Sequence, residues 1–176
     1  MANNIYEFEL SHDSIGMLIK NLKSYKKSLE SIDKYILEEL AKYTHERVVY
    51  YIATSVGDNY PPTDELINSI QISEYLANSI RVYTENVYAY YVEYGTGVIG
   101  AENAHPKSSE AGWTYDKNGH GEEGWVYKVG DNEYYWTQGE EAHQFMYRAF
   151  EDLKEHSEEI IIKVLKSRGI IKWIQS

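Results

Sequence analysis

Residues 87–95 read VYAYYVEYG, eight residues free of Gly and Pro that end at a glycine. Because glycine readily adopts the left-handed conformation that terminates helices, the stretch predicts a two-turn helix stopped by Gly95. At about 100° per residue its four tyrosines surround most of such a helix, so they cannot all face one small core. They are either half-exposed members of a core helix or part of a subunit interface, where Tyr is enriched. The four are Tyr88, Tyr90, Tyr91 and Tyr94.

The segment before this helix predicts a β-hairpin. Ile70 and Ile72 alternate with polar residues, and so do Ile80 and Val82. Such a period of two is typical of antiparallel strands that bury one face. Together with the Tyr-rich helix, the hairpin forms a predicted core over residues 63–97, entered through a short helical turn.

A long helix is predicted over residues 11–56. Its apolar residues recur at spacings of three and four, the heptad pattern of helices that pack on other helices. At 1.5 Å per residue, about 40 residues would make a helix roughly 60 Å long, which exceeds the width of a domain of this size. We therefore expect the helix to break near Tyr43–Arg47, or to project and pack on another subunit. The heptad positions are Ile15, Leu18, Leu22, Tyr25, Leu29, Ile32 and Ile36.

The composition changes after the core segment. Residues 96–139 hold eight of the 12 glycines and three of the four tryptophans. Two copies of a Gly-Trp-x-Tyr pattern, at residues 112–115 and 124–127, predict paired strands around a turn. Tyr134 and Trp136 add a third strand. Aromatic residues on short strands favour an interaction surface, with a mobile surface loop as the alternative. The interface candidates in this insertion, residues 98–139, are Trp113, Tyr115, Trp125, Tyr127 and Trp136.

The last element is predicted as a helix over residues 140–169. Glu140 and Glu141 would lie in its first turn and basic residues in its last, as the helix dipole favours. Together these segments predict a single α+β domain over residues 1–176. It consists of a long N-terminal helix, a small antiparallel sheet with a short Tyr-rich helix, and a C-terminal helix packed on the sheet.

The composition argues against several classes of function. The chain has 28 acids against 17 bases, a net charge of -11, which does not suit a protein that binds nucleic acid as its main ligand. The absence of Cys removes disulfides, thiolate metal sites and thiol nucleophiles. No run approaches the roughly 20 apolar residues that span a bilayer, so we expect no membrane partner.

The histidines do not form a recognisable catalytic or metal-binding pattern. No two of the six have the i,i+4 spacing that places two imidazoles on one helical face. We therefore predict that His105, His120 and His143 are scattered surface histidines. The alternative is a metal site that Glu122 or Glu123 would complete. No Ser lies in a nucleophile elbow and no glycine-rich stretch matches a phosphate-binding loop. The sequence predicts a non-enzymatic protein without cofactor or metal.

Three segments occur in an order that resembles a known family. They read LINSI at residues 66–70, YAYYVEYGT at residues 88–96 and FMYRA at residues 145–149. This order, and the second block in particular, resembles the neck and tail-completion (head–tail joining) proteins of long-tailed bacteriophages and prophages. Their pattern is approximately Leu-x-x-Ser-Ile, Tyr-Ala-x-x-Val-Glu-x-Gly-Thr and Pro-Phe-x-x-x-Ala, and Gln144 stands where that proline is usual. The matching positions are Tyr88, Ala89, Glu93, Gly95, Thr96, Phe145 and Ala149.

The resemblance implies a structural virion protein at the head-proximal end of a phage tail, or of a phage-tail-like particle, assembled in the bacterial host cytoplasm. It implies a tail-completion (tail-terminator) or head–tail joining ring of identical subunits, commonly six. Such a ring contacts the tail tube protein and the neck or connector proteins. If it lines a DNA conduit, an acidic lumen would repel phosphate, and DNA would be passing cargo and not a ligand.

The resemblance also assigns roles to residues. Glu93 and Thr96 would hold the helix end and the following turn in place, and Glu93 would pair with Arg148 across the fold. A ring needs heterologous interfaces that close. Contacts between subunits are expected from Tyr88, Tyr91 and Tyr94, together with the aromatic residues of the insertion.

A second class of function stays open. Carbohydrate-binding modules also use exposed Trp and Tyr faces. Trp113, Trp125 and Trp136 therefore predict a glycan-binding module as the alternative, although the heptad helix suits protein partners better.

Overall fold

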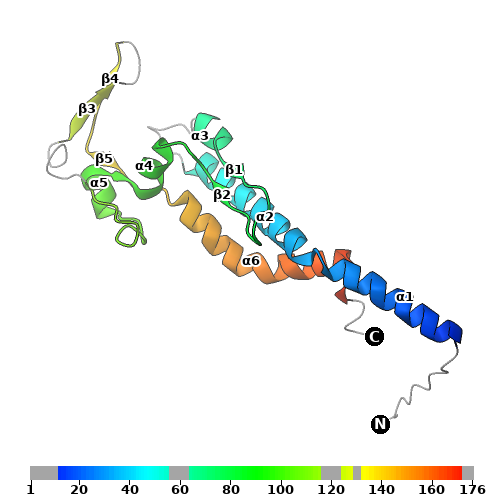
Figure 1. The fold of residues 1–176 in the computed structure, drawn as a ribbon. Helices are drawn as coiled ribbons and strands as arrows, with labels where there is room; N and C mark the ends of the chain where they lie inside the picture. Colours follow the sequence, from blue (N-terminus) through cyan, green and yellow to red (C-terminus); the bar gives the residue numbers. More distant parts are fainter. Residues whose placement is uncertain (1–11, 56–63, 116–123, 129–131, 172–176) are drawn as a thin grey trace, which may run out of the picture.

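The computed structural model describes residues 12–55, 64–115, 124–128 and 132–171, and it has the predicted α+β class. Its elements are α1 (His12–Leu29), α2 (Ile32–Thr54), α3 (Asp64–Asn68), β1 (Gln71–Ile72), β2 (Val82–Tyr83), α4 (Tyr88–Tyr94), α5 (Gly97–Glu102), β3 (Trp125–Lys128), β4 (Tyr134–Thr137), β5 (Gly139–Glu140) and α6 (Phe145–Ser167). Helices α2 and α6 lie side by side (Figure 1). Helix α1 extends away from one end of this pair, and the β3–β4 hairpin extends from the other end (Figure 1). In the part of the chain that the structure describes, no helix is both long and apolar enough to cross a bilayer.

The N-terminal helix is interrupted at Glu30–Ser31, between α1 and α2. Ser31 departs from helical geometry, with φ -136° and ψ 13°. Serine is a poor residue for a helix interior because its hydroxyl competes for backbone hydrogen bonds. The predicted break near Tyr43–Arg47 is wrong, because contacts with α6 hold this part of α2 in place. Arg47, for example, donates a hydrogen bond to Asp152 of α6.

The core lies between α2, α6 and the segments that connect them. Val48 and Ala149 are fully buried, and Phe145 at the start of α6 is only 1% exposed. Helix α6 thus packs mainly along α2, whereas the sequence predicted that it would pack on the sheet. The two-stranded sheet offers too small a surface for a helix of 23 residues. The core cluster comprises Val48, Tyr51, Ile52, Leu66, Ile70, Ala89, Phe145 and Ala149.

A polar network joins α2 to α6 beside this core. The Asp152 carboxylate accepts hydrogen bonds from the Arg47 guanidinium at 2.5 Å and from the Tyr51 hydroxyl at 2.7 Å. Burial raises the pKa of Asp152, but these two hydrogen bonds outweigh it, and the pKa lies below its ordinary value. Charge-assisted hydrogen bonds of this kind fix the rotation of one helix against the other.

The predicted first hairpin is confirmed. Strands β1 and β2 are antiparallel, with Gln71 opposite Tyr83 and Ile72 opposite Val82. The turn between them has two successive residues with positive φ, Ala77 and Asn78, as the tight turns of hairpins require. The hairpin lies on α2 and helps to cover the core.

The second hairpin pairs β3 with β4. The predicted pairing of the two Gly-Trp-x-Tyr segments is therefore wrong. Trp113–Tyr115 form no strand, because their polar groups bond instead to Tyr94, the last residue of α4, and to Gly95, which follows it. The Trp113 indole N–H donates to the carbonyl of Gly95, and the Tyr115 hydroxyl donates to that of Tyr94. The predicted third strand, at Tyr134 and Trp136, is confirmed as β4.

We expect Phe145→Ala to lower the free energy of unfolding by about 3–5 kcal/mol, because it leaves a cavity in the core. Phe150→Ala is the matched control: it changes the same residue type on the same helix, where the ring is 52% exposed. It should cost less than about 1 kcal/mol. Urea unfolding followed by circular dichroism measures both. Equal losses would contradict the placement of the core.

Candidate interaction site

Directly after α4, the segment of residues 95–97 crosses the segment of residues 139–140 at very short distance. Gly95 has φ +76°, and a Cβ there would lie 2.6 Å from the carbonyl oxygen of Glu140. Gly139 has φ +110°, and its Cβ would lie 2.0 Å from the carbonyl oxygen of Thr96. Antiparallel bridges join Thr96 to Glu140 and Gly97 to Gly139. Gly95 and Gly139 are needed because the two backbones lie too close together to leave room for a side chain. The predicted end of the helix at Gly95 is confirmed.

The buried carboxylate of Glu93 joins α4 to α6. Its Oε2 accepts a hydrogen bond from the N–H of Met146 at 2.8 Å, and its Oε1 accepts one from the N–H of Tyr147 at 3.0 Å. The first turn of a helix leaves such N–H groups without partners, and the helix dipole also favours a negative charge there. The predicted Glu93–Arg148 pair is wrong, because the carboxylate is occupied by these groups and by His105. The Arg148 guanidinium lies over the Tyr51 ring, 4.0 Å from its centre.

Helix α6 begins at Phe145, five residues later than predicted, because Gln144 adopts a left-handed conformation with φ +56°. The N–H of Gln144 donates to the carbonyl of Glu93 at 3.2 Å. Proline could neither adopt this positive φ nor donate this hydrogen bond. The glutamine in place of the family's usual proline is thus consistent with the geometry of this chain.

His105 is buried, so the prediction of a surface histidine is wrong for this residue. Its Nδ1 accepts a hydrogen bond from the N–H of Lys107 at 2.9 Å. The proton therefore lies on Nε2, which donates to Glu93 Oε1 at 3.0 Å. A second bond holds the same turn, from the N–H of His105 to the Tyr115 hydroxyl. His105 completes the environment of the Glu93 carboxylate, a long-range partnership that no local pattern signals.

His143 is also largely buried, and the surface prediction is wrong here too, with Nε2 lying 2.7 Å from Glu140 Oε1. The hydrogen bond with Glu140 raises the pKa of His143 above its ordinary value, against the opposing effect of burial. His120, Glu122 and Glu123 lie outside the described residues. Among the residues that are described, no three of His, Asp or Glu are grouped to hold a metal ion.

Several predicted interface residues pack within the chain. Trp113 stacks on Tyr94 with 5.3 Å between ring centres and meets Tyr91 edge-on at 5.7 Å. Together with the bonds from Trp113 and Tyr115 to the end of α4, these contacts hold the segment after α5 against α4. Of this cluster, Tyr91 is the residue left exposed, at 45%.

Tyr88 and Ala89 are the first two residues of α4, and Ala89 is the more deeply buried of the two. Ala89 is buried in the core cluster, and Tyr88 packs against its edge. Burial, with a contribution from Glu140, raises the pKa of the Tyr88 hydroxyl to about 12. The tyrosine that α4 leaves most exposed is Tyr90, at 59%.

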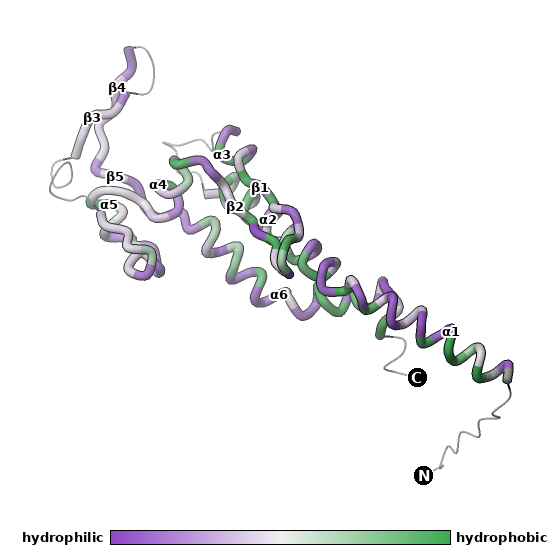
Figure 2. The backbone as a smooth tube through the Cα atoms, viewed as in Figure 1, coloured by the Kyte–Doolittle hydropathy of each residue, from purple (hydrophilic) through white to green (hydrophobic). Residues whose placement is uncertain are grey.

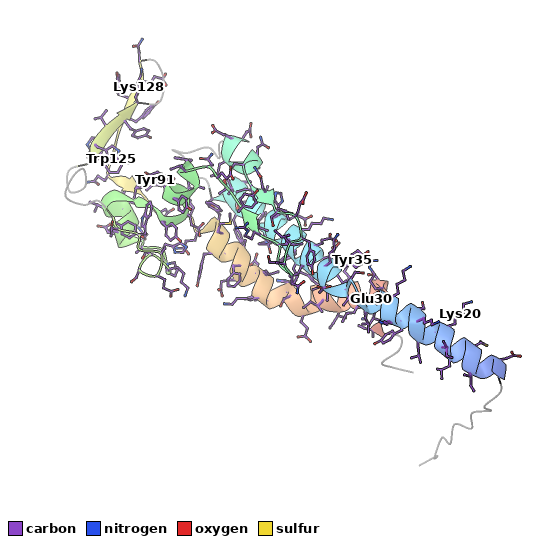
Figure 3. The ribbon with its side chains drawn as sticks, in the orientation of Figure 1. Lys20, Glu30, Tyr35, Tyr91, Trp125 and Lys128 are labelled. Atoms are coloured by element: carbon purple, nitrogen blue, oxygen red, sulfur yellow. The ribbon has the colours of Figure 1, made fainter. Side chains whose placement is uncertain are left out.

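The β3–β4 hairpin presents an exposed apolar face. Its register places Val126 opposite Trp136 and Lys128 opposite Tyr134, and these four residues form what we call the outer face. Val126, Tyr134 and Trp136 are each 59–64% exposed. On the other face, at the base of the hairpin, lies Trp125 (Figure 3). One atom of its ring would lie 2.9 Å from a Cβ placed at Gly97.

The outer face contains residues that the prediction of an interface did not include. Val126 and Tyr134 belong to it as much as Trp136 does. A period-two alternation along β3 and β4 is the signal that could have grouped them. Trp125 and Tyr127, which were predicted as interface residues, face the other way and are half-buried.

We expect Glu93→Gln to lower the free energy of unfolding by about 2 kcal/mol. The amide of Gln keeps one acceptor but turns N–H groups toward donors at the start of α6 or at His105. Glu102→Gln, which removes an exposed carboxylate from α5, is the matched control and should change little. Urea unfolding at one pH measures both. A Glu93→Gln loss no larger than that of Glu102→Gln would show that Glu93 does not join the helices.

The raised pKa of His143 predicts a pH dependence of stability. Protonated His143 is favoured in the folded chain by Glu140, so this contribution is fully present below the ordinary pKa of 6.5. It is lost as the pH rises through the higher folded value. His143→Gln should flatten the fall in unfolding free energy as the pH rises above about 6.5. His156→Gln, at an exposed site on α6, is the control. Identical pH profiles for His143→Gln and the parent chain would contradict the linkage.

Comparisons of the chain with protein-family models, with curated proteins and with solved structures found no match. The resemblance to phage neck proteins therefore rests on the residues of the three motifs. In the described structure, these motif residues surround the junction of α4, β5 and α6 and the adjoining core.

Proposed function

We propose that this chain is a structural, non-enzymatic subunit at the head-proximal end of a phage tail or phage-like particle, of the tail-completion or head–tail joining type. It would act through contacts with copies of itself in a ring, with the tail tube and with neck or connector proteins. The observation that carries the proposal is the exposed outer face of the β3–β4 hairpin, on an element that extends away from the body (Figure 1).

The hairpin has the properties of an element that needs a partner. Apart from their mutual pairing, β3 and β4 contact other elements only weakly. A two-stranded hairpin is at best marginally stable in water, and unpaired strand edges readily accept another chain. Large aromatic side chains such as Trp136 are enriched at protein interfaces, because they bury much area while losing little conformational freedom. A protein partner on the outer face would cover these residues and stabilise the hairpin.

The motif residues have structural roles, which suits a protein that works through assembly. Glu93 caps α6, Gly95 and Thr96 cross β5, and Phe145 and Ala149 lie in the core. Together they form the frame from which the hairpin extends. Each of these roles is structural and involves no chemical reaction. Their arrangement supports a role in positioning the hairpin.

The charge of the chain also supports this role. A ring of subunits that each carry -11 would repel the phosphates of DNA moving through its lumen. DNA would then pass as cargo without binding. The proposal requires lumen-facing residues that are net acidic.

The glycan-binding alternative is less well supported by the geometry. Sugar-binding platforms need aromatic rings that face one ligand. Trp136 lies on the outer face, Trp125 on the opposite face, and Trp113 is stacked on Tyr94 with its indole N–H bonded to Gly95. The three tryptophans therefore do not share a surface.

We expect Tyr134→Ser combined with Trp136→Ser to abolish binding to purified tail tubes or connector protein of the phage or prophage that encodes the chain. Co-sedimentation and negative-stain microscopy would measure it. The fold should persist, because both side chains are exposed. Tyr90→Ser, which removes an exposed tyrosine from α4, is the matched control and should bind as the parent chain does.

Two results would count against the proposal. A parent chain that binds neither tail tubes nor connector protein would contradict the role in the tail. Tight binding to a cell-wall polysaccharide, lost on Trp136→Ser, would favour the glycan-binding alternative.

A further inference from the structure

Helix α1 carries an apolar stripe that stays exposed in the described structure. Ile15, Leu18, Ile19 and Leu22 form this α1 stripe, and each is 43–56% exposed. Figure 2 shows hydrophobic residues recurring along α1, which extends beyond the paired helices. Exposed apolar residues at helical spacing on an element with so few contacts of its own indicate a surface that another protein covers.

The width of the stripe distinguishes between two kinds of partner. At about 100° per residue, its four residues fall within an arc of about 100°. A two-stranded coiled coil uses a narrower seam, whereas a helix that lies in a groove uses an arc of this width. The stripe is also flanked asymmetrically: Lys20, Lys23 and Lys27 follow the edge beside Ile19, and the opposite edge has uncharged polar residues.

A groove of matching character lies on the body of the molecule. It measures about 300 Å³ and is formed by α2, the first hairpin and α6. Its apolar lining includes Leu37, Leu40, Val82, Met146, Phe150 and Leu153. Along both α2 and α6 it spans about two helical turns, roughly 10 Å, and the α1 stripe from Ile15 to Leu22 has the same length.

The α1 helix of the same chain does not reach this groove in the described structure. It continues beyond α2 on the side away from the β3–β4 hairpin, so that Lys20 lies farther from the body than Glu30 and Tyr35 (Figure 3). Helical hydrogen bonds run up to both sides of the interruption, from Glu30 N–H to the Lys26 carbonyl and from Tyr35 N–H to the Ser31 carbonyl. Helix α1 therefore points away from its own groove and leaves it open to another molecule.

The charges favour a second copy of this chain as that molecule. Helix α1 has four lysines and one aspartate, a net charge of +3. The rest of the chain has 13 bases and 27 acids, a net charge of -14. The α1 helix of one copy is thus attracted to the body of another, while two α1 helices repel each other.

We propose that α1 of one copy docks its apolar stripe in the groove of a second copy, with Leu18 and Leu22 as the central anchors. The contact joins two different surfaces, so it is heterologous, and repeated contacts close into a ring or exchange arms within a pair. It involves neither the outer face of the hairpin nor a tail partner. It rests on the contact between copies that the proposed function includes and specifies the two surfaces that meet, and the hairpin variant below tests it apart from binding to the tail.

Because the chain has no Cys, engineered thiols give a direct test of the pairing. One variant carries Leu18→Cys and a differently tagged second variant carries Phe150→Cys, on the exposed rim of the groove. The two are mixed and treated with a short thiol-specific cross-linker. We expect cross-linked pairs that contain both tags. Met17→Cys, on the side of α1 opposite the stripe, replaces Leu18→Cys in the control and should give few such pairs.

The other products of this experiment would overturn the proposal. Pairs that join only Leu18→Cys chains would indicate a coiled coil of α1 helices. A double variant that cross-links within one chain, at a concentration where the mixture gives no pairs, would indicate that α1 folds back onto its own groove. If no cross-link forms and the chain is a monomer by analytical ultracentrifugation, α1 of a second copy does not occupy the groove.

Self-association provides a second measurement. Leu18→Ser with Leu22→Ser should weaken it about 30-fold, as expected for two central anchors, and Met17→Ser should not. Lys20→Glu with Lys23→Glu should also weaken it, since the body that receives α1 is acidic, whereas a coiled coil of α1 helices would lose repulsion and tighten. The hairpin variant with Tyr134→Ser and Trp136→Ser should keep the cross-link, which separates this contact from binding to the tail.

Discussion

The described body depends on one buried carboxylate. Glu93 accepts hydrogen bonds from two N–H groups of the first turn of α6 and from His105. A buried carboxylate is costly unless such donors surround it, so α4, α6 and the segment containing His105 must come together for the fold to form. The same junction includes the glycine crossing of residues 95–97 with β5. Glu93 thereby sets where the β3–β4 hairpin leaves the body.

Around this junction the protein has a compact core and two elements that extend beyond it. The core, which lies mainly between α2 and α6, buries Val48, Phe145 and Ala149, whereas α1 and the β3–β4 hairpin expose apolar residues at opposite ends (Figure 1). Such surfaces are unfavourable for an isolated chain in water and become favourable when a partner covers them. A subunit that uses one end for copies of itself and the other for different proteins would have this distribution.

Local patterns were sufficient for several elements. Period-two alternation predicted the first hairpin, and glycine at position 95 predicted the end of α4, because each depends on neighbouring residues only. The prediction failed where a distant partner decided the outcome. Trp113 and Tyr115 have the sequence of a strand but bond to the end of α4, and Arg47 keeps α2 helical through Asp152. Nothing near His105 in the sequence signals that its Nε2–H donates a hydrogen bond to Glu93.

The sequence by itself determined the α+β class, the helical and strand periodicities and the acidic, cysteine-free character of the chain, since these follow from residue types and their spacing. Only the tertiary structure decided which polar groups meet. It directed Glu93 to Met146 and Tyr147 of α6 and not to Arg148, and it joined Arg47 of α2 to Asp152 of α6. Such outcomes depend on contacts between segments more than 50 residues apart, as in Glu93 with Met146, and local spacing carries no information about them.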